Sequence, residues 1–296
     1  MVLALWLSAC ASVTPSPDTP ATPATPPAVP PVAQPVKPPR IGLALGGGAA
    51  RGFAHVGVIQ VLEREGLRPD LVAGTSAGSL VAVLYASGMK PAELERAALA
   101  MDEATIADWT LPLLSRGMLR GQALARYVNQ QVGGKPLQDL PLPVGVVATD
   151  LQSGDGIVFR RGDVGTAVRA SSAVPGVFQP VAISGREYVD GGLVAPVPVR
   201  QARQMGADLV IAVDISSAPE GNPTGDTLQL LLQTFAIMGR SINRHELATA
   251  DLVVRPQLAG VSSAAFSERQ RAMAAGRAAM EAALPRLKML MLRPAP

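Results

Sequence analysis

Cysteine is almost absent from this 296-residue chain, in which Cys10 is the only one. A single cysteine excludes an intramolecular disulfide and any metal site built on several cysteine ligands. Histidine is nearly as scarce, with only His55 and His245, so a serine-histidine-aspartate triad has few candidates for its base. We expect neither a metal ion nor an organic cofactor.

Clusters of basic residues are also missing, and this absence limits the kinds of binding partner that we expect. The formal net charge is only +3, and no run of five or more lysine or arginine residues occurs. This charge pattern does not favour nucleic-acid binding. The hydrophobic content of 48% is enough for one large α/β core behind a tail.

The lone cysteine follows Leu7-Ser8-Ala9 at the end of a short apolar stretch. This arrangement resembles the lipobox of bacterial lipoproteins, in which the cysteine is acylated. A secretory signal usually has a basic start and about 15 to 30 residues, whereas nine residues precede Cys10 and none is basic. We expect residues 1–10 to be a truncated lipoprotein signal whose start lies further upstream. The alternative is an incidental cysteine in an apolar N-terminus.

Residues 11–39 contain 11 of the 27 prolines, together with many alanines, threonines and valines. Such a segment cannot pack a core and favours extended polyproline II structure. We interpret it as a tether between a lipidated Cys10 and a folded domain. The expected location is the bacterial cell envelope, on a membrane, and the alanine after Cys10 is compatible with the outer membrane. The alternatives are a disordered tail without an anchoring role and, if the signal is accidental, a cytoplasmic protein.

The rest of the chain alternates short apolar runs with helical patterns, which predicts a three-layer α/β/α fold with a mostly parallel central sheet. The predicted strands are 41–45, 71–73, 144–148, 157–159, 187–189 and 209–215. The predicted helices are 53–65, 77–87, 91–101, 120–131, 164–172, 198–205, 227–249 and 266–291.

Two glycine-rich segments stand at consecutive strand-to-helix turns. The first is Gly46-Gly47-Gly48-Ala49-Ala50-Arg51-Gly52, and the second is Gly74-Thr75-Ser76-Ala77-Gly78. A lone G-x-S-x-G is a weak signal, but the two segments in this order are a strong one. The carboxyl ends of neighbouring parallel strands meet at one sheet edge, so the two turns are expected to face each other.

These turns carry the residue types that acyl transfer requires. Ser76 has the setting of a nucleophile elbow, in which Gly74 and Gly78 permit close backbone approach. The backbone N–H groups of Gly47 and Gly48 are predicted to stabilise the oxyanion. A phosphate-binding turn is the other interpretation of the first segment, but the lysine and serine or threonine of a P-loop are missing.

The base is harder to assign from the residues alone. Neither histidine is well placed, since His55 suits a buried structural role at a helix start and His245 has no turn motif beside it. A carboxylate is therefore favoured. Asp190 is followed by Gly191 and Gly192, which would allow substrate to approach, but Asp150 and Asp214 also end strand-like runs and stay open.

Taken together, Gly46 to Gly52, Gly74 to Gly78 and Asp190-Gly191 resemble the patatin-like phospholipase family. The segment 170–180 is similar to a further block of its bacterial members, and the resemblance runs from about Arg40 to near Gly276. It implies a patatin-like acyl hydrolase domain over residues 40–296 with a Ser-Asp dyad. By this resemblance Ser76 is the nucleophile, Asp190 accepts its proton, and Gly46, Gly47, Gly48 and Arg51 form the oxyanion side.

The implied activity is hydrolysis of lipid carboxylic esters, of phospholipase A or lysophospholipase type, through an acyl-enzyme. An acyltransferase with the same dyad and a non-catalytic envelope lipoprotein that binds lipid or protein are the alternatives. The expected partners are an acyl-ester substrate and a membrane, and the oligomeric state is not predicted. The apolar segment 106–119 is expected either to line a groove for acyl chains or to belong to the core.

Overall fold

The computed structural model describes residues 38–292, apart from 103, 105–106, 109–115 and 262–265. The predicted signal and all but the last two residues of the predicted tether lie outside these residues. Most of the predicted acyl groove at 106–119 does so as well. Those interpretations stay predictions.

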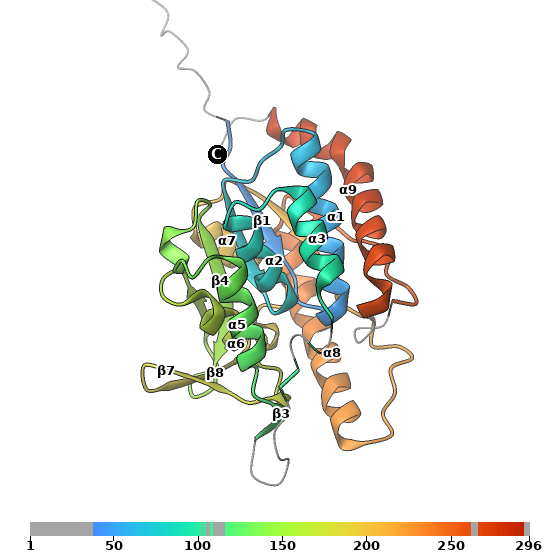
Figure 1. Cartoon of the computed structure of the whole chain (residues 1–296). Coiled ribbons are helices and arrows are strands. Elements are labelled where there is room, and N and C mark those ends of the chain that lie inside the picture. Colours follow the sequence, from blue (N-terminus) through green and yellow to red (C-terminus); the bar gives the residue numbers. More distant parts are fainter. Residues whose placement is uncertain (1–37, 103, 105–106, 109–115, 262–265, 293–296) are drawn as a thin grey trace, which may run out of the picture. The chain divides into compact units, whose positions relative to one another are not determined.

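One large mixed sheet organises the described chain (Figure 1). Its strands run in the order β10-β9-β1-β2-β4-β8-β7, and β5 also pairs with β4. The pairs from β10 to β4 are parallel, whereas β8, β7 and β5 join antiparallel. Their bounds are β1 Ile41–Leu45, β2 Leu71–Thr75, β4 Val144–Asp150, β5 Gly156–Phe159, β7 Val181–Ile183, β8 Arg186–Asp190, β9 Leu209–Val213 and β10 Leu252–Val254. Two further short strands, β3 Gly117–Leu119 and β6 Gly176–Phe178, pair with each other.

Helices cover both faces of the sheet, because strands buried on both sides need apolar partners on both. They are α1 Phe53–Arg64, α2 Ala77–Ala86, α3 Pro91–Ala100, α5 Gln122–Gln131, α6 Val164–Ser171, α7 Val199–Gln204, α8 Thr227–Glu246 and α9 Arg269–Met291. Alternate residues of β1 point to opposite faces. Leu43 and Leu45 join a large cluster with α1, α2 and α9, and Ala44 joins a smaller one with α7.

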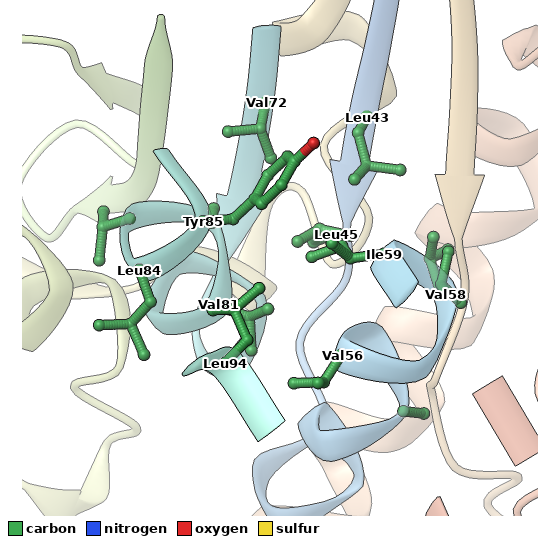
Figure 2. Packing of buried hydrophobic residues seen from close by; sticks show 14 of the residues in the cluster. Leu43, Leu45, Val56, Val58, Ile59, Val72, Val81, Leu84, Tyr85 and Leu94 are labelled. Atoms are coloured by element: carbon green, nitrogen blue, oxygen red, sulfur yellow. The ribbon is translucent and has the colours of Figure 1, made fainter. Parts of the chain in front are cut away.

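The larger cluster forms the main core beside the two glycine-rich turns (Figure 2). Leu45 of β1, Ile59 of α1 and Val81 of α2 all belong to it, so the helices that begin at these turns are fixed against the sheet. None of the helices in the described part of the chain combines the length and the apolar character that a membrane crossing requires.

The predicted three-layer architecture with a mostly parallel sheet is confirmed. Every predicted helix and strand is present, with ends that differ by a few residues at most. The strand expected at 209–215 ends earlier, at Val213. Four strands of three residues each, β3, β6, β7 and β10, were not predicted.

Candidate active site

The register of the sheet brings Ser76 and Asp190 to the same edge. Thr75 at the end of β2 lies opposite Val147 of β4, and the next β4 residue, Ala148, lies opposite Asp190 of β8. Ser76 follows Thr75 directly and precedes α2. The two side chains predicted as nucleophile and base therefore stand on strands that are separated by β4 alone.

Ser76 occupies a strained turn. Its backbone has φ 53° and ψ −124°, a conformation that residues with a side chain seldom adopt. Its N–H donates to the Ser171 hydroxyl at 2.9 Å, and its carbonyl accepts from the Ser79 hydroxyl at 2.6 Å. Strain of this kind persists when surrounding contacts hold it, and it clusters at functional sites. The arrangement is that of a nucleophile elbow.

Asp190 is buried, with 6% of its surface exposed. Its Oδ1 accepts from the Gly192 N–H at 2.7 Å, and its backbone carbonyl accepts from the Thr149 hydroxyl at 2.8 Å. Oδ2 is buried and has no hydrogen bond of regular geometry within the described residues. Burial raises the pKa of Asp190 to about 6, even though the Ser76 hydroxyl and the Gly192 N–H act to lower it.

The Ser76 hydroxyl is thus close enough to lower the pKa of the Asp190 carboxyl, but the two side chains form no hydrogen bond of regular geometry. Catalytic hydrogen bonds in unliganded enzymes are often loose and tighten when substrate binds.

The other two candidate carboxylates have partners. Asp150 forms an ion pair with Arg186, and that bond, together with N–H groups of Gln152 and Ser153, lowers the pKa of Asp150 to about 2. Asp214 forms an ion pair with Arg255 at 3.1 Å. The lowered pKa makes Asp150 a poor proton acceptor, and Asp214 is engaged by Arg255, whereas no ion pair links Asp190 to a basic side chain in the described chain.

The first glycine-rich turn lies directly against Ser76. A Cβ atom added to Gly47 would stand 3.3 Å from the Ser76 Cβ. The turn leads into a short 3-10 helix, Ala49–Gly52, whose first residue has φ 50°. Ala49 and Ser76 are thus both strained, and their turns face each other as predicted.

The hydrogen bonds of this turn correct one detail of the prediction. The Gly46 N–H donates to the Val213 carbonyl at 3.1 Å, and the Gly47 N–H donates to the Pro196 carbonyl at 2.9 Å. The Gly47 amide, predicted as an oxyanion donor, is therefore already engaged. The Gly48 N–H donates to no group within the described residues.

Arg51 and His55 are buried and form hydrogen bonds with the first glycine-rich turn. The Arg51 side chain is largely buried, and its Nη2 donates to the Ser216 carbonyl at 2.6 Å. The backbone N–H of Arg51 donates to the Gly48 carbonyl at 3.1 Å. His55 is fully buried, and its Nε2 lies 2.8 Å from the Gly46 carbonyl oxygen. His245, the other histidine, lies exposed at the end of α8.

Within the described residues, no group of three or more histidine, cysteine, aspartate or glutamate side chains is placed to hold a metal ion. The motif glycines instead serve close packing of backbone segments. A Cβ on Gly74 would lie 2.4 Å from the Gly78 carbonyl oxygen, and one on Gly191 would lie 2.3 Å from that of Val147.

The closeness of Gly47 to Ser76 gives a first prediction. Replacing Gly47 by alanine is expected to leave the protein folded, because its neighbours lie 3.3 to 3.8 Å from the new methyl group. The methyl group would crowd the side chain of Ser76, the predicted nucleophile, and is expected to lower turnover by about 10²-fold, the scale of one lost oxyanion donor.

Gly225→Ala is the matched control, because its new methyl group meets only the end of the Gln229 side chain at 3.6 Å. Thermal unfolding and steady-state rates of both variants make the comparison. A Gly47→Ala protein with wild-type turnover would contradict the placement of this turn beside the predicted nucleophile.

Known proteins show the same sequence pattern and the same fold. The family model described as patatin-like phospholipase matches residues 43–203. An uncharacterized NTE family protein of Mycobacterium tuberculosis is 39% identical over 184 residues, which cover 62% of this chain and 51% of that protein. A second such protein of this organism is 31% identical over 274 residues, or 82% and 46% of the two chains.

Mouse patatin-like phospholipase domain-containing protein 6 is 35% identical over 198 residues, covering 64% of this chain and 14% of the relative. The chain thus spans about half the length of the mycobacterial relatives and less of the mouse protein.

Among solved structures, VipD from Legionella pneumophila matches with a TM-score of 0.51 at 15% identity, covering 84% of this chain and 67% of that one. The type III effector protein ExoU matches with a TM-score of 0.51 at 16% identity, covering 87% and 54%. At these identities the likeness concerns the fold. The family model covers more than half of the chain and both glycine-rich turns, and it includes Ser76 and Asp190. The chain therefore belongs to the patatin-like phospholipase family.

Proposed function

We propose that this protein is a serine hydrolase of lipid carboxylic esters, with Ser76 as nucleophile and Asp190 as base. The observation that carries the proposal is the buried Asp190 carboxylate, which adjoins a serine on a strained turn and whose Oδ2 has no regular hydrogen bond to any described residue. Membership of a phospholipase family supports lipid as the substrate class.

The proposed reaction has two steps, the acylation of Ser76 and the hydrolysis of the acyl-enzyme. The Ser76 oxygen attacks the ester carbonyl carbon while its proton passes to Asp190, and the Gly48 N–H donates to the oxyanion that forms. Collapse breaks the ester bond, and the leaving alcohol takes the proton from Asp190, which leaves an acyl group on Ser76. Water then attacks this acyl-enzyme while one of its protons passes to Asp190, and collapse releases a fatty acid as Asp190 returns that proton to the Ser76 oxygen.

The raised pKa of Asp190 suits its proposed role as a general base. An unperturbed carboxylate is a weak base for a hydroxyl, and catalysis is most efficient when the pKa of the base lies near the working pH. A pKa of about 6 leaves Asp190 mostly ionised at neutral pH and makes it a stronger base than an exposed aspartate.

This pKa predicts the pH dependence. The base must be a carboxylate, so kcat/KM is expected to fall about tenfold per pH unit below pH 6 and to level off above it. Initial rates from pH 4.5 to 8, with circular dichroism at each pH to confirm folding, provide the measurement. An acidic limb that bends near pH 4 would instead indicate an unperturbed aspartate.

Product analysis separates hydrolysis from its alternatives. The domain from Arg40 onwards is mixed with mixed micelles of phosphatidylcholine and detergent, with and without glycerol, beside its Ser76→Ala variant. Free fatty acid in both mixtures, absent with Ser76→Ala, supports a hydrolase. Acylglycerol in place of fatty acid identifies a transferase, and no Ser76-dependent product would favour a binding protein.

The membrane attachment is part of the same proposal. We propose that Cys10 is lipidated and that residues 11–39 tether the domain to the bacterial envelope, where its substrate lies. The support is the sequence pattern alone. Mass spectrometry of the chain expressed behind a complete lipoprotein signal tests it, with Cys10→Ala as control. An unmodified cysteine in the membrane fraction would contradict the proposal.

A further inference from the structure

His55 is a buried histidine that the proposed mechanism leaves unused. It stands in the first turn of α1 with no exposed surface. Its Nε2 lies 2.8 Å from the carbonyl oxygen of Gly46. A carbonyl oxygen only accepts hydrogen bonds, so Nε2 must carry the proton in this contact.

Burial keeps this ring neutral. Burial lowers the pKa of His55 to about 4 and outweighs the Gly46 bond and the charge of Asp214, which both act to raise it. The single proton of the neutral ring therefore resides on Nε2. Nδ1 then holds only a lone pair and has no partner within the described residues. Neither nitrogen bonds Ser76 or Asp190, so His55 is not the base of the site.

The peptide that His55 contacts is held at both ends. The Gly46 carbonyl accepts from His55, and the N–H of the same peptide, that of Gly47, donates to the Pro196 carbonyl at 2.9 Å. Two bonds on opposite sides of a planar peptide fix its rotation about the chain. The next peptide carries the Gly48 N–H, which donates to no group in the described part of the chain, and the direction of this N–H depends on the orientation of the first peptide.

We propose that His55 is a positioning residue for acyl transfer, which orients the Gly46–Gly47 peptide and thereby aims the Gly48 N–H at the oxyanion formed on Ser76. The inference rests on the proposed function. A donor placed before the reaction begins stabilises the transition state without a reorganisation cost, so a loosened turn lowers turnover while substrate binding persists.

Two substitutions at position 55 separate this positioning role from simple packing. His55→Gln retains an N–H donor at the end of a side chain of similar reach, whereas His55→Leu fills the space without a donor. His245→Gln, on the exposed histidine, is the matched control. We expect His55→Leu to lower kcat about 10- to 10²-fold with KM within threefold, and His55→Gln to recover most of that loss.

The affinity of a transition-state analogue provides a second readout, which measures stabilisation of the oxyanion. A trifluoromethyl ketone forms a tetrahedral adduct with a serine nucleophile, so its affinity should fall in His55→Leu by the same factor as kcat. A purely structural role would change the melting temperature of both variants and leave the two factors unrelated. Should His55→Leu fail to fold, His55→Asn replaces it, because its shorter side chain retains polarity but does not reach Gly46.

The outcomes are distinct for the two proposals. An active wild type, an inactive Ser76→Ala and an undiminished His55→Leu would overturn the role of His55 alone. Equal losses in His55→Gln and His55→Leu would do the same. A wild type without Ser76-dependent esterase activity would overturn both the proposed function and this inference.

Discussion

Replacing Asp190 by asparagine is expected to abolish most activity and yet to stabilise the folded protein at pH 8. The amide cannot accept the Ser76 proton, so the rate should fall by about 10² to 10⁴-fold, the usual contribution of a general base. The shape of the side chain is unchanged, and its carbonyl oxygen still accepts from the Gly192 N–H.

The gain in stability follows from the direction of the pKa shift. The pKa of Asp190 rises from 3.8 to about 6 on folding, so the folded state holds the proton more tightly than the unfolded state. The stability that the folded state gains from binding this proton is complete below pH 3.8 and is lost as the pH rises through 6. At pH 8 the buried charge costs the wild type about 2 to 3 kcal/mol, which asparagine avoids.

Thermal or urea unfolding of wild type and Asp190→Asn at pH 8 and at pH 4 measures this difference. The variant should be more stable at pH 8, and the gap should close at pH 4. Ser153→Ala, in an exposed turn, serves as the control for an ordinary surface change. A destabilised variant at pH 8 would mean that the carboxylate is stabilised by contacts other than those described here.

Replacing Gly78 by alanine is expected to prevent stable folding. A Cβ atom at this position would lie 2.1 Å from the carbonyl oxygen of Leu45 and 2.7 Å from that of Gly46. Both atoms belong to backbone that is fixed in the sheet and the first turn, so neither can move aside cheaply. Overpacking of side chains costs about 1–3 kcal/mol, and a backbone clash exceeds that range.

The free energy of unfolding of Gly78→Ala, or its soluble yield, gives the result, with Gly225→Ala again as control. A folded Gly78→Ala protein with wild-type stability would show that β1 and the start of α2 are further apart than described. The comparison also distinguishes this glycine from Gly47, whose substitution should affect turnover and not folding.

The fold was largely predictable because its signals are local. Apolar runs that end at glycines predicted the strand-turn-helix units around Gly46 and Ser76. The strands β3, β6, β7 and β10 escaped prediction, since a three-residue strand has no periodicity of its own and exists through its pairing with a neighbour.

The site was predictable only in part, because its hydrogen bonds join residues far apart in the sequence. Asp150, Asp190 and Asp214 all end strand-like runs, and only the three-dimensional structure shows that two of them are paired with arginines. The Gly47 N–H is occupied by Pro196, a residue of a distant loop that no motif indicates. The bond from His55 to Gly46 likewise depends on how α1 is placed against the turn.

Covalent labelling of Ser76 by a fluorophosphonate tests the central claim most directly. The probe phosphonylates a serine only when that serine is activated, and peptide mapping by mass spectrometry locates the modified residue. We predict a label on Ser76 in the wild type, no label at that position in Ser76→Ala, and strongly slowed labelling in Asp190→Asn. A folded wild type that stays unlabelled, or that is labelled at another serine, would contradict the Ser76-Asp190 dyad.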